Sequence, residues 1–334
     1  MKQEKLVSQP VFITQDSMML NIIKSIKQVA RVGAKLLLTG ENGTGKEVMA
    51  QLFHYHSKRN KEPMMAINCG AIPADLVESE LFGHEKGAFT GAHEQKKGCF
   101  EIADGSTLFL DEIGEMPMSM QIKMLRAIET GSFRRVGGRQ EVQVDVNLIS
   151  ATNKILIDQV KSGSFREDLF YRINVIELYL PPLRHRKNDI PLLVSHYKDH
   201  FANLYGKEEI EFNDDCMSLF MENKWPGNVR ELKNVVERSV VLSNSSVITP
   251  EFLPSWFHNS KKIYPVTNVH ADENFIQIPI GTSLGDIERM VIDKTLMTVD
   301  NNKTKAAKIL GLTRKTLHNK LDKYSKELPI TTSN

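Results

Sequence analysis

The chain has 334 residues, a length that corresponds to two or three compact domains. Charged residues make up 25% and hydrophobic residues 41%, which are ordinary globular values and exclude a fibrous or wholly disordered chain. The net charge is only +2, so any surface that attracts a polyanion must be local.

The first half of the chain alternates short apolar runs with longer amphipathic stretches. Asp16-Ser17 is a typical helix N-cap, and apolar residues follow it at helical spacing from residue 22 to residue 30. Five later runs are predicted strands, at residues 35–38, 64–67, 107–110, 144–150 and 175–180. This alternation predicts an α/β fold, a parallel sheet with helices on both faces.

A glycine-rich segment separates the first of these strands from the next helix. It consists of Gly40, Glu41, Asn42, Gly43, Thr44, Gly45, Lys46 and Glu47. Glycines let the backbone curl so that successive N–H groups face a phosphate, and the following helix N-terminus adds a positive dipole. Lys46 can reach the terminal phosphates of a nucleotide. The segment therefore predicts a phosphate-binding loop, although Glu47 stands where a Ser or Thr usually supports magnesium.

The predicted strand at residues 107–110 ends in two acids. Asp111 can hold a magnesium ion, and Glu112 can polarise the attacking water. Adjacent buried acids are costly without a cation, which argues against a purely structural role. Together the two motifs predict an ATPase with ATP and Mg²⁺ as cofactors, and Glu112 favours hydrolysis over transfer to a second substrate.

A third motif places one large aromatic ring between small, turn-forming residues: Gly87, Ala88, Phe89, Thr90, Gly91 and Ala92. An exposed ring on such a loop suits transient contact with a protein, whereas a ring folded into the core would make this an ordinary surface loop. The six residues resemble, without change, the GAFTGA loop of sigma-54-dependent transcription activators, the NtrC family of AAA+ ATPases. This resemblance covers the chain after about residue 9. It implies that the loop engages sigma-54 through Phe89 and Thr90.

The same resemblance implies roles for further residues. The second nucleotide signature of the family matches Ala103, Asp104, Gly105, Ser106, Thr107, Leu108, Phe109, Leu110, Asp111 and Glu112. The implied catalytic residues are Asn68, which holds the glutamate, Thr152 and Asn153 of the first sensor, the arginine fingers Arg166 and Arg172, and Arg230 of the second sensor. Judged from the residues alone, Arg166 and Arg172 are also compatible with surface arginines of a helix.

The second half of the chain changes character twice. Residues 189 to about 242 have a helical pattern throughout, and serines and prolines then fragment residues 244–281 into a predicted linker. A last helical unit runs from residue 284 to about residue 327. The cysteines, Cys69, Cys99 and Cys216, have no CxxC spacing, which favours buried thiols in a reducing compartment.

Residues 302–321 have the pattern of a helix, a glycine turn and a second helix, with Thr304 and Thr313 as N-caps. Basic residues greatly outnumber acids between residues 301 and 326, which suits a phosphate backbone. The predicted DNA contacts are Lys303, Thr304, Lys305, Thr313, Arg314, Lys315, Thr316, His318, Asn319 and Lys320. The unit resembles the Fis-type domain of the same activator family, which implies that the helix before it pairs two subunits. A basic helical cap without DNA is the alternative.

The sequence thus predicts a short N-terminal segment at 1–15, an AAA+ α/β subdomain at 16–182 and a helical lid at 183–243. A linker at 244–281 and a Fis-type helix-turn-helix domain at 282–334 follow. No apolar run approaches the roughly 18 residues of a membrane span, and the start lacks a signal peptide, so we expect a soluble, cytoplasmic protein.

The expected function is that of a sigma-54-dependent activator. Such a protein binds upstream enhancer DNA, assembles from dimers into a hexameric ring, and couples ATP hydrolysis to remodelling of the sigma-54 RNA polymerase closed complex. One alternative is a DNA-binding regulator that uses ATP only to switch its oligomeric state, and the GAFTGA loop argues against it. A small-molecule kinase lacks an acceptor site and leaves the helix-turn-helix unexplained. The short first segment suggests either control by a separate regulatory protein or a front that has been removed.

Overall fold

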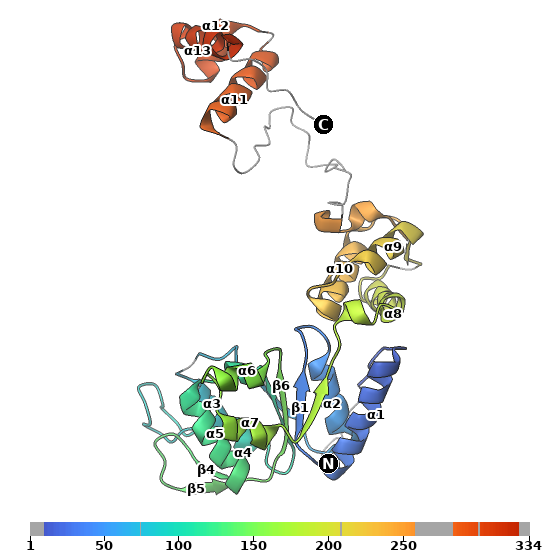
Figure 1. The fold of residues 1–334 in the computed structure, drawn as a ribbon, viewed down its shortest axis with the longest axis vertical. Coiled ribbons are helices and arrows are strands. Elements are labelled where there is room, and N and C mark those ends of the chain that lie inside the picture. The colour runs from blue at the N-terminus through green and yellow to red at the C-terminus, as the bar shows by residue number, and fades with distance from the viewer. Residues whose placement is uncertain (1–9, 74, 208, 258–282, 300, 327–334) are drawn as a thin grey trace. The chain divides into compact units, whose positions relative to one another are not determined.

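The computed structural model describes residues 10–73, 75–207, 209–257, 283–299 and 301–326 (Figure 1). The chain divides into two compact units, Met1–Lys262 and Ile263–Asn334. Residues 1–9 of the predicted first segment, residues 258–281 of the predicted linker and the end of the chain after residue 326 lie outside the described residues. Within the described ranges, no helix is both long and apolar enough to cross a membrane.

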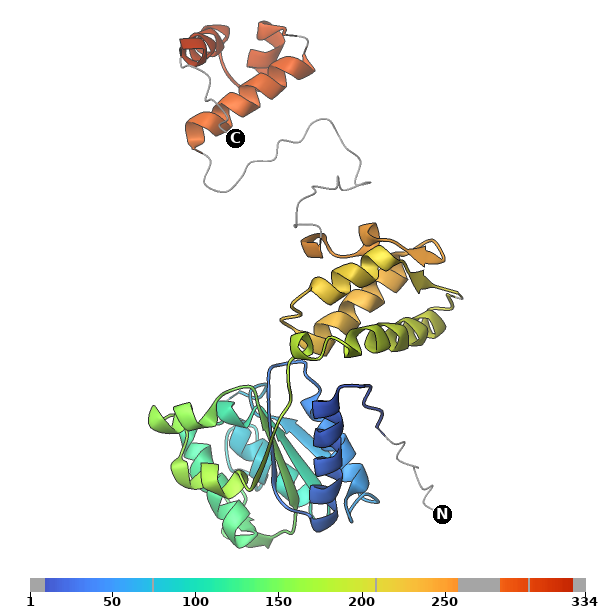
Figure 2. The ribbon, with the colours of Figure 1, turned by 45° about the vertical axis from the view of Figure 1, so that its right-hand side comes forward.

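A five-stranded sheet forms the centre of the first unit, and every strand pair in it is parallel (Figure 2). In spatial order its strands are β2 (Met65–Asn68), β3 (Thr107–Asp111), β6 (Asn147–Thr152), β1 (Leu36–Thr39) and β7 (Ile176–Tyr179). The predicted parallel α/β sheet is confirmed. Because all strands point the same way, their carboxyl ends meet at one edge, where Asn68 pairs with Asp111 and Thr39 with Thr152.

Helices cover both faces of this sheet. On one face lie α1 (Ser17–Val32) and α2 (Lys46–His56). On the other face lie α3 (Val77–Phe82), α4 (Cys99–Ile102), α5 (Met118–Thr130), α6 (Leu156–Lys161) and α7 (Glu167–Ile173). Alternation along β1 serves both cores, since Leu36 and Leu38 pack with α1 and α2 while Leu37 packs with the opposite helices. The predicted cap is confirmed, because the Asp16 carboxylate accepts from the Met19 N–H at 3.0 Å.

One predicted strand begins too early. The sequence predicts one strand at residues 144–150, but β6 starts at Asn147. The residues before it follow an antiparallel hairpin of β4 (Ser132–Arg134) and β5 (Glu141–Gln143). Each strand of that hairpin has three residues, which is too short for a period of two to be recognised.

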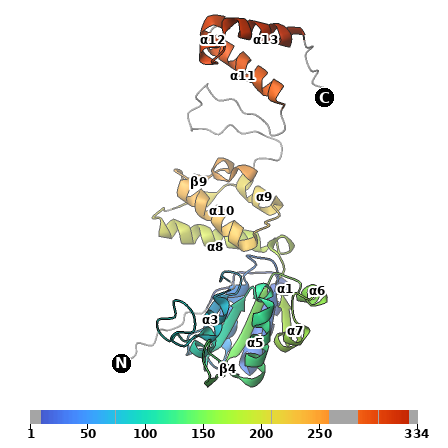
Figure 3. The ribbon, with the colours of Figure 1, turned by 90° about the vertical axis from the view of Figure 1, so that its left-hand side faces the viewer.

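The lid of the first unit contains α8 (Asp189–Leu204), α9 (Asp214–Glu222) and α10 (Asn228–Leu242), packed around Trp225 and Phe220 (Figure 3). Three short 3₁₀ turns flank them: η2 (Leu183–His185), η3 (Pro250–Phe252) and η4 (Ser255–Phe257). A fourth, η1 (Ile113–Glu115), follows β3 in the sheet. The all-helical prediction for 189–242 is wrong at β8 (Glu211–Phe212), which pairs with β9 (Val247–Ile248).

The second unit has three described helices, α11 (Leu284–Thr298), α12 (Lys303–Ile309) and α13 (Arg314–Lys326). Their core contains Ile292, Leu296, Ala306, Ala307 and Leu317. Gly311 makes the turn between α12 and α13 with φ +65°.

Only one of the two caps predicted for this unit is found. Thr313 accepts from the Thr316 N–H at 3.1 Å, as predicted. The Thr304 prediction is wrong, because the Asn302 side chain caps α12 by accepting from the N–H groups of Thr304 and Lys305.

All three cysteines lie in the first unit, and all are buried. The buried thiols that the sequence predicts are therefore confirmed. Burial raises the pKa of Cys69 and Cys216 to about 12 and that of Cys99 to about 11.

Candidate functional site

The phosphate-binding loop lies between β1 and α2. Gly40, Gly43 and Gly45 all have φ between +78° and +145°, a region that favours glycine. A Cβ on Gly40 would meet the Leu180 carbonyl at 2.6 Å, so this close approach requires glycine. Lys46 begins α2, and its ammonium donates to the carbonyls of Gly40 at 2.7 Å and Glu41 at 3.1 Å. Burial lowers the pKa of Lys46, while Asp111 and Glu112 act in the opposite direction.

The two acids stand where β3 ends. Asp111 accepts the Glu112 N–H at 3.0 Å, and Glu112 has φ +52°, a strained conformation for a side chain of this size. This turn brings the Glu112 carboxylate beside Gly70, where a Cβ would lie 2.4 Å from Oε2. The Asn68 side chain accepts from the N–H groups of Gly70 and Ala71. Among the described residues, Asn68 and Glu112 are not hydrogen-bonded to each other.

A cavity of about 420 Å³ connects the loop, the acids and the lid, a size suited to a small ligand. Predicted residues in its lining are Asn42, Gly43, Gly45, Lys46, Glu47, Asn68, Asp111, Glu112 and Arg230. The sequence did not single out Val48, Tyr197, Val229, Lys233 and Asn234, which also line it. The three polar residues among these come from α8 and α10, and no motif connects those helices to the loop.

The other residues of the predicted second signature form strand β3 and the turn that leads into it. Residues 107–110 are buried in β3, and the Thr107 hydroxyl bonds to His54 Nδ1 at 2.9 Å. Asp104 is exposed and accepts the Asp145 N–H at 2.8 Å. Within residues 103–112, the cavity lining consists of Asp111 and Glu112.

The predicted sensor and finger residues occupy different surroundings. Thr152 is buried at the end of β6 and accepts the Lys154 N–H, whereas Asn153 is exposed. Arg166 forms an ion pair with Asp168 at 2.6 Å. Arg172 lies exposed on α7 without a carboxylate partner among the residues that the structure describes. Neither Arg166 nor Arg172 lines the cavity of its own chain.

The loop at residues 87–92 projects an aromatic ring. Gly87 and Gly91 have φ of +80° and +107°, and a Cβ on either would meet no atom within 4 Å. Phe89 between them is 40% exposed. The hairpin of β4 and β5 approaches the loop closely, since a Cβ on Gly137 would lie 2.8 Å from the Ala88 side chain. The ring is therefore outside the core, at the tip of a loop whose stem the hairpin supports.

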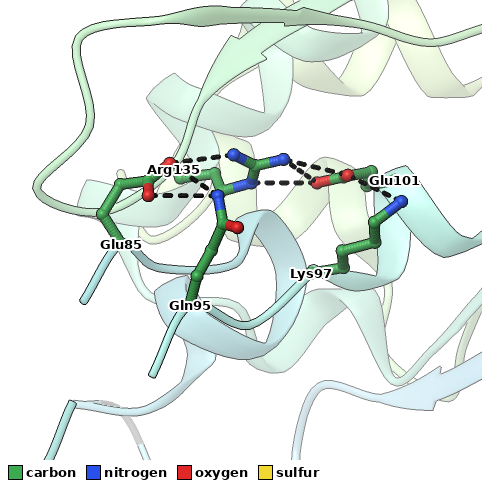
Figure 4. A network of polar contacts seen from close by, with 5 residues as sticks. All are labelled: Glu85, Gln95, Lys97, Glu101 and Arg135. Carbon is green, nitrogen blue, oxygen red and sulfur yellow. Dashed lines mark hydrogen bonds and ion pairs between the residues drawn. The ribbon is translucent and has the colours of Figure 1, made fainter. Parts of the chain in front are cut away.

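An ionic network holds that stem (Figure 4). Arg135 follows β4 and donates to Glu85 at 2.8 Å and to both carboxylate oxygens of Glu101 on α4. Gln95 donates to Glu85, and Lys97 pairs with Glu101 at 3.1 Å. Hydrogen bonds from Arg135 are the main cause that lowers the pKa of Glu85. The network thus connects the loop stem to α4, the helix immediately before β3 and its two acids.

In the second unit, α12 and the start of α13 expose a basic surface. Its exposed members are Lys303, Thr304, Lys305, Thr313, Arg314, Lys315, His318 and Asn319. Thr316 is half-buried. The ammonium of Lys320 forms an ion pair with Glu288 of α11 at 2.6 Å, and Glu288 also accepts the Tyr324 hydroxyl at 2.8 Å. Lys320 is thus directed towards its own domain.

Three family models match consecutive parts of the chain. The sigma-54 interaction domain matches residues 12–179, which is half of the chain. The chain belongs to the sigma-54-dependent activators of the NtrC family. The AAA+ ATPase lid domain matches residues 184–268, and the bacterial regulatory protein, Fis family, matches residues 283–324. The family and the AAA+ ATPase activity predicted from the sequence are confirmed.

Named relatives of this sigma-54 activator are similar over most of its length. Regulatory protein AtoC of Escherichia coli K12 is 43% identical over 317 residues, which cover 93% of this chain and 67% of AtoC. The DNA-binding transcriptional regulator NtrC of Rhizobium meliloti strain 1021 is 41% identical over 332 residues, covering 92% and 68%. A crystal structure of NtrX from Brucella abortus with ADP is 31% identical, with a TM-score of 0.72 and coverage of 94% and 69%. The crystal structure of NtrX with ATP has a TM-score of 0.71. The activator spans about two thirds of the length of these relatives.

The activator also contains a contact that its motifs do not reveal. Glu41 belongs to the phosphate-binding loop but does not line the cavity. Arg184 of η2 donates to its two carboxylate oxygens at 2.8 and 2.6 Å. These hydrogen bonds are the main reason that the pKa of Glu41 falls to about 2. The two residues are 143 positions apart, and neither carries a signal for the other in the sequence.

Proposed function

We propose that this activator binds upstream DNA, assembles into a ring and uses ATP hydrolysis to press the loop at residues 87–92 against sigma-54, which remodels the RNA polymerase closed complex. The exposed Phe89, set between two unhindered glycines, is the observation that carries this proposal. Its stem is anchored through Arg135 to α4, which leads into the strand that ends at the two acids. The loop stem is thus linked, by this ion pair and the chain between α4 and β3, to the strand that ends at the two acids.

We place ATP hydrolysis in the part of the cavity that the phosphate-binding loop and the two acids line. The backbone amides of residues 43–46 and the Lys46 ammonium hold the phosphates. Glu112 orients the attacking water and accepts its proton. Asn68 would restrain that carboxylate before the loop engages its target, for which its side chain would have to turn from the Gly70 and Ala71 amides.

Asp111 would hold a magnesium ion together with the nucleotide. Among the described residues, no group of three or more His, Cys, Asp or Glu residues is placed to hold a metal. Asp111 and Glu112 line the cavity together with Lys46, and Mg²⁺ commonly uses one or two carboxylates and takes its other ligands from phosphates and water. When bound, Mg²⁺ neutralises charge on the phosphate oxygens.

We further propose that Arg166 and Arg172 act on the nucleotide of a neighbouring subunit. Both lie away from the cavity of their own chain, and Arg172 has no carboxylate partner among the described residues. An arginine supplied from outside stabilises the charge on the transferred phosphoryl group, with typical gains on the order of 10³ to 10⁵ in rate. Arg166 would have to leave Asp168 to take this role.

The DNA-binding part of the proposal rests on the exposed basic surface of α12 and α13. The start of α13 presents Arg314, Lys315 and His318, and we assign it to the major groove. Helix α11 would pair two subunits, and its Met290 is 39% exposed.

The test is reconstituted transcription with the full chain. With sigma-54 polymerase on a template that carries a bound upstream site, ATP should yield open promoter complexes, and ADP should not. An ATP transition-state analogue, ADP with aluminium fluoride, should trap sigma-54 on the activator. ATP-dependent assembly and DNA binding without trapping or promoter opening would instead favour a regulator that uses ATP only as an oligomerisation switch.

A further inference from the structure

The phosphate-binding loop is joined to the lid by an amide that no motif marks. Asn228 is the first residue of α10 and is fully buried, with φ +53°. Its side-chain nitrogen donates to the Glu41 carboxylate at 3.1 Å and to the Asn42 carbonyl at 3.0 Å. Its side-chain oxygen accepts the Leu183 N–H of η2 at 2.7 Å. One side chain of α10 therefore contacts both the phosphate-binding loop and η2.

The backbone continues this junction. The Val229 N–H donates to the Gly43 carbonyl at 3.0 Å. A Cβ on Gly43 would lie 2.3 Å from the Gly227 carbonyl and 3.1 Å from the Arg230 Cβ. The first turn of α10 is thus packed directly onto the loop, with no space for even a methyl group between them.

The position of Arg230 depends on this first turn of α10. It lies two residues after Asn228 and lines the nucleotide cavity together with Lys46. Because Arg230 lies in the first turn of α10, the placement of this turn determines where its side chain enters the cavity. The Glu41 carboxylate stabilises the first turn of α10, because it accepts hydrogen bonds from both Asn228 and Arg184.

We propose that Glu41 and Asn228 are positioning residues for ATP hydrolysis. They fix the first turn of α10 on the phosphate-binding loop and thereby place Arg230 beside the phosphates, while Arg184 holds Glu41 in the orientation that this requires. Glu41 thus serves the lid and not the nucleotide. The inference rests on the role proposed above for Arg230.

The test is a double-mutant cycle on the ATPase activity of the full chain. Asn228→Asp keeps the size of the side chain, the acceptor for Leu183 and a residue type that tolerates positive φ. It removes the donor and sets a second carboxylate against Glu41. We expect kcat to fall about 10-fold to about 100-fold with a smaller change in KM, since small misplacements of catalytic groups have effects of this size.

The decisive comparison adds Arg230→Ala. If Asn228 acts through Arg230, the double variant should be no more than about twofold slower than Arg230→Ala alone, because coupled residues are not additive. A purely structural role predicts effects that multiply, and that result would overturn the inference. Arg238→Ala is the matched control, since Arg238 is an exposed arginine on the same helix outside the nucleotide cavity, and kcat should stay at the wild-type value.

Two further variants keep the test decisive. If Asn228→Asp does not fold, Glu41→Gln replaces it, because Glu41 is only half-buried; its effect on kcat should likewise vanish in the Arg230→Ala background. Wild-type kcat in both Glu41→Gln and Asn228→Asp would refute the inference. If Arg230→Ala alone hydrolyses ATP at the wild-type rate, the proposed role of Arg230 fails together with this inference, while ATP hydrolysis by the other residues stands.

Discussion

The ring of Phe89 stands edge-on to the imidazole of His84, with 5.0 Å between the two centroids. His84 is buried, and its Nδ1 is hydrogen-bonded to the Ser79 hydroxyl at 2.7 Å, so the imidazole against which Phe89 packs is held in place. Phe89 leaves 40% of its surface exposed. The ring is held against the stem without entering the core, and it is therefore available to a partner.

Replacing this ring should separate partner contact from folding. Phe89→Ala should retain nucleotide binding and at least half of the ATPase activity, and should lose sigma-54 trapping and promoter opening. The free energy of unfolding should fall by clearly less than the roughly 3–5 kcal/mol of a buried phenylalanine. Phe82→Ala, at a buried ring on α3, is the matched control and should show the full destabilisation. A folded Phe89→Ala variant that opens promoters at the wild-type rate would contradict the proposed function.

The two ends of the cavity should respond differently to mutation. Glu112→Gln should bind ATP normally and lose most hydrolysis, because it keeps the phosphate contacts and removes the base. Lys46→Ala should weaken ATP binding and hydrolysis together. Glu115→Gln is the control, since Glu115 lies three residues further on, is exposed and pairs with Lys154 at 2.7 Å. ATPase assays and nucleotide titrations decide, and near-normal turnover by Glu112→Gln would remove the assignment of the base.

Mixing subunits tests whether the arginines act between chains. Arg172→Ala and Lys46→Ala should each be nearly inactive alone. Their mixture should recover part of the activity, because some interfaces then combine an intact cavity with an intact arginine. Activity per chain should also rise with protein concentration. Arg31→Ala, an exposed arginine on α1, should hydrolyse ATP normally by itself. No recovery in any mixture, at any concentration, would speak against a shared site.

The Glu41 carboxylate should contribute to acid stability. Its pKa falls from 4.5 to about 2 in the folded chain, chiefly through Arg184. A lowered pKa means that the contribution is present above pH 4.5 and is lost as the pH falls towards 2. Glu41→Gln should therefore reduce stability near neutral pH and flatten its decline between pH 4.5 and 2. Urea unfolding across this range measures both effects, with Glu222→Gln, an exposed residue at the end of α9, as the control. Parallel curves for wild type and Glu41→Gln would be inconsistent with this.

The basic surface of the second unit should contain residues with three different effects on DNA binding. Arg314→Ala should change the preference among sequences, because we propose that the start of α13 enters the major groove, where base edges are read. Lys303→Ala should weaken all sequences and reduce the salt dependence by about one ion. Lys320→Ala should lower affinity less than Lys303→Ala, because its ammonium already pairs with Glu288. Binding isotherms at several salt concentrations check this, and an equal loss for both lysines would contradict it.

The sequence predicted those parts of the fold that repeat or carry a motif. The alternation of apolar runs and helices predicted the parallel sheet, and the two nucleotide motifs predicted residues that the structure brings together in one cavity. It did not predict the three-residue strands β4 and β5, because short pairings have no measurable period. Nor did it reveal the contact of Glu41 with Arg184, because two residues 143 positions apart share no local sequence pattern.

The burial of the three cysteines allows selective chemical labelling of the chain. Reagents such as maleimides attack the thiolate, and pKa values of about 11 to 12 leave almost none of it at neutral pH. A cysteine introduced at the exposed Thr90 would therefore be the one fast-reacting thiol of the chain, with the native cysteines left in place. A fluorophore or crosslinker attached there would measure directly whether the loop tip moves during ATP turnover.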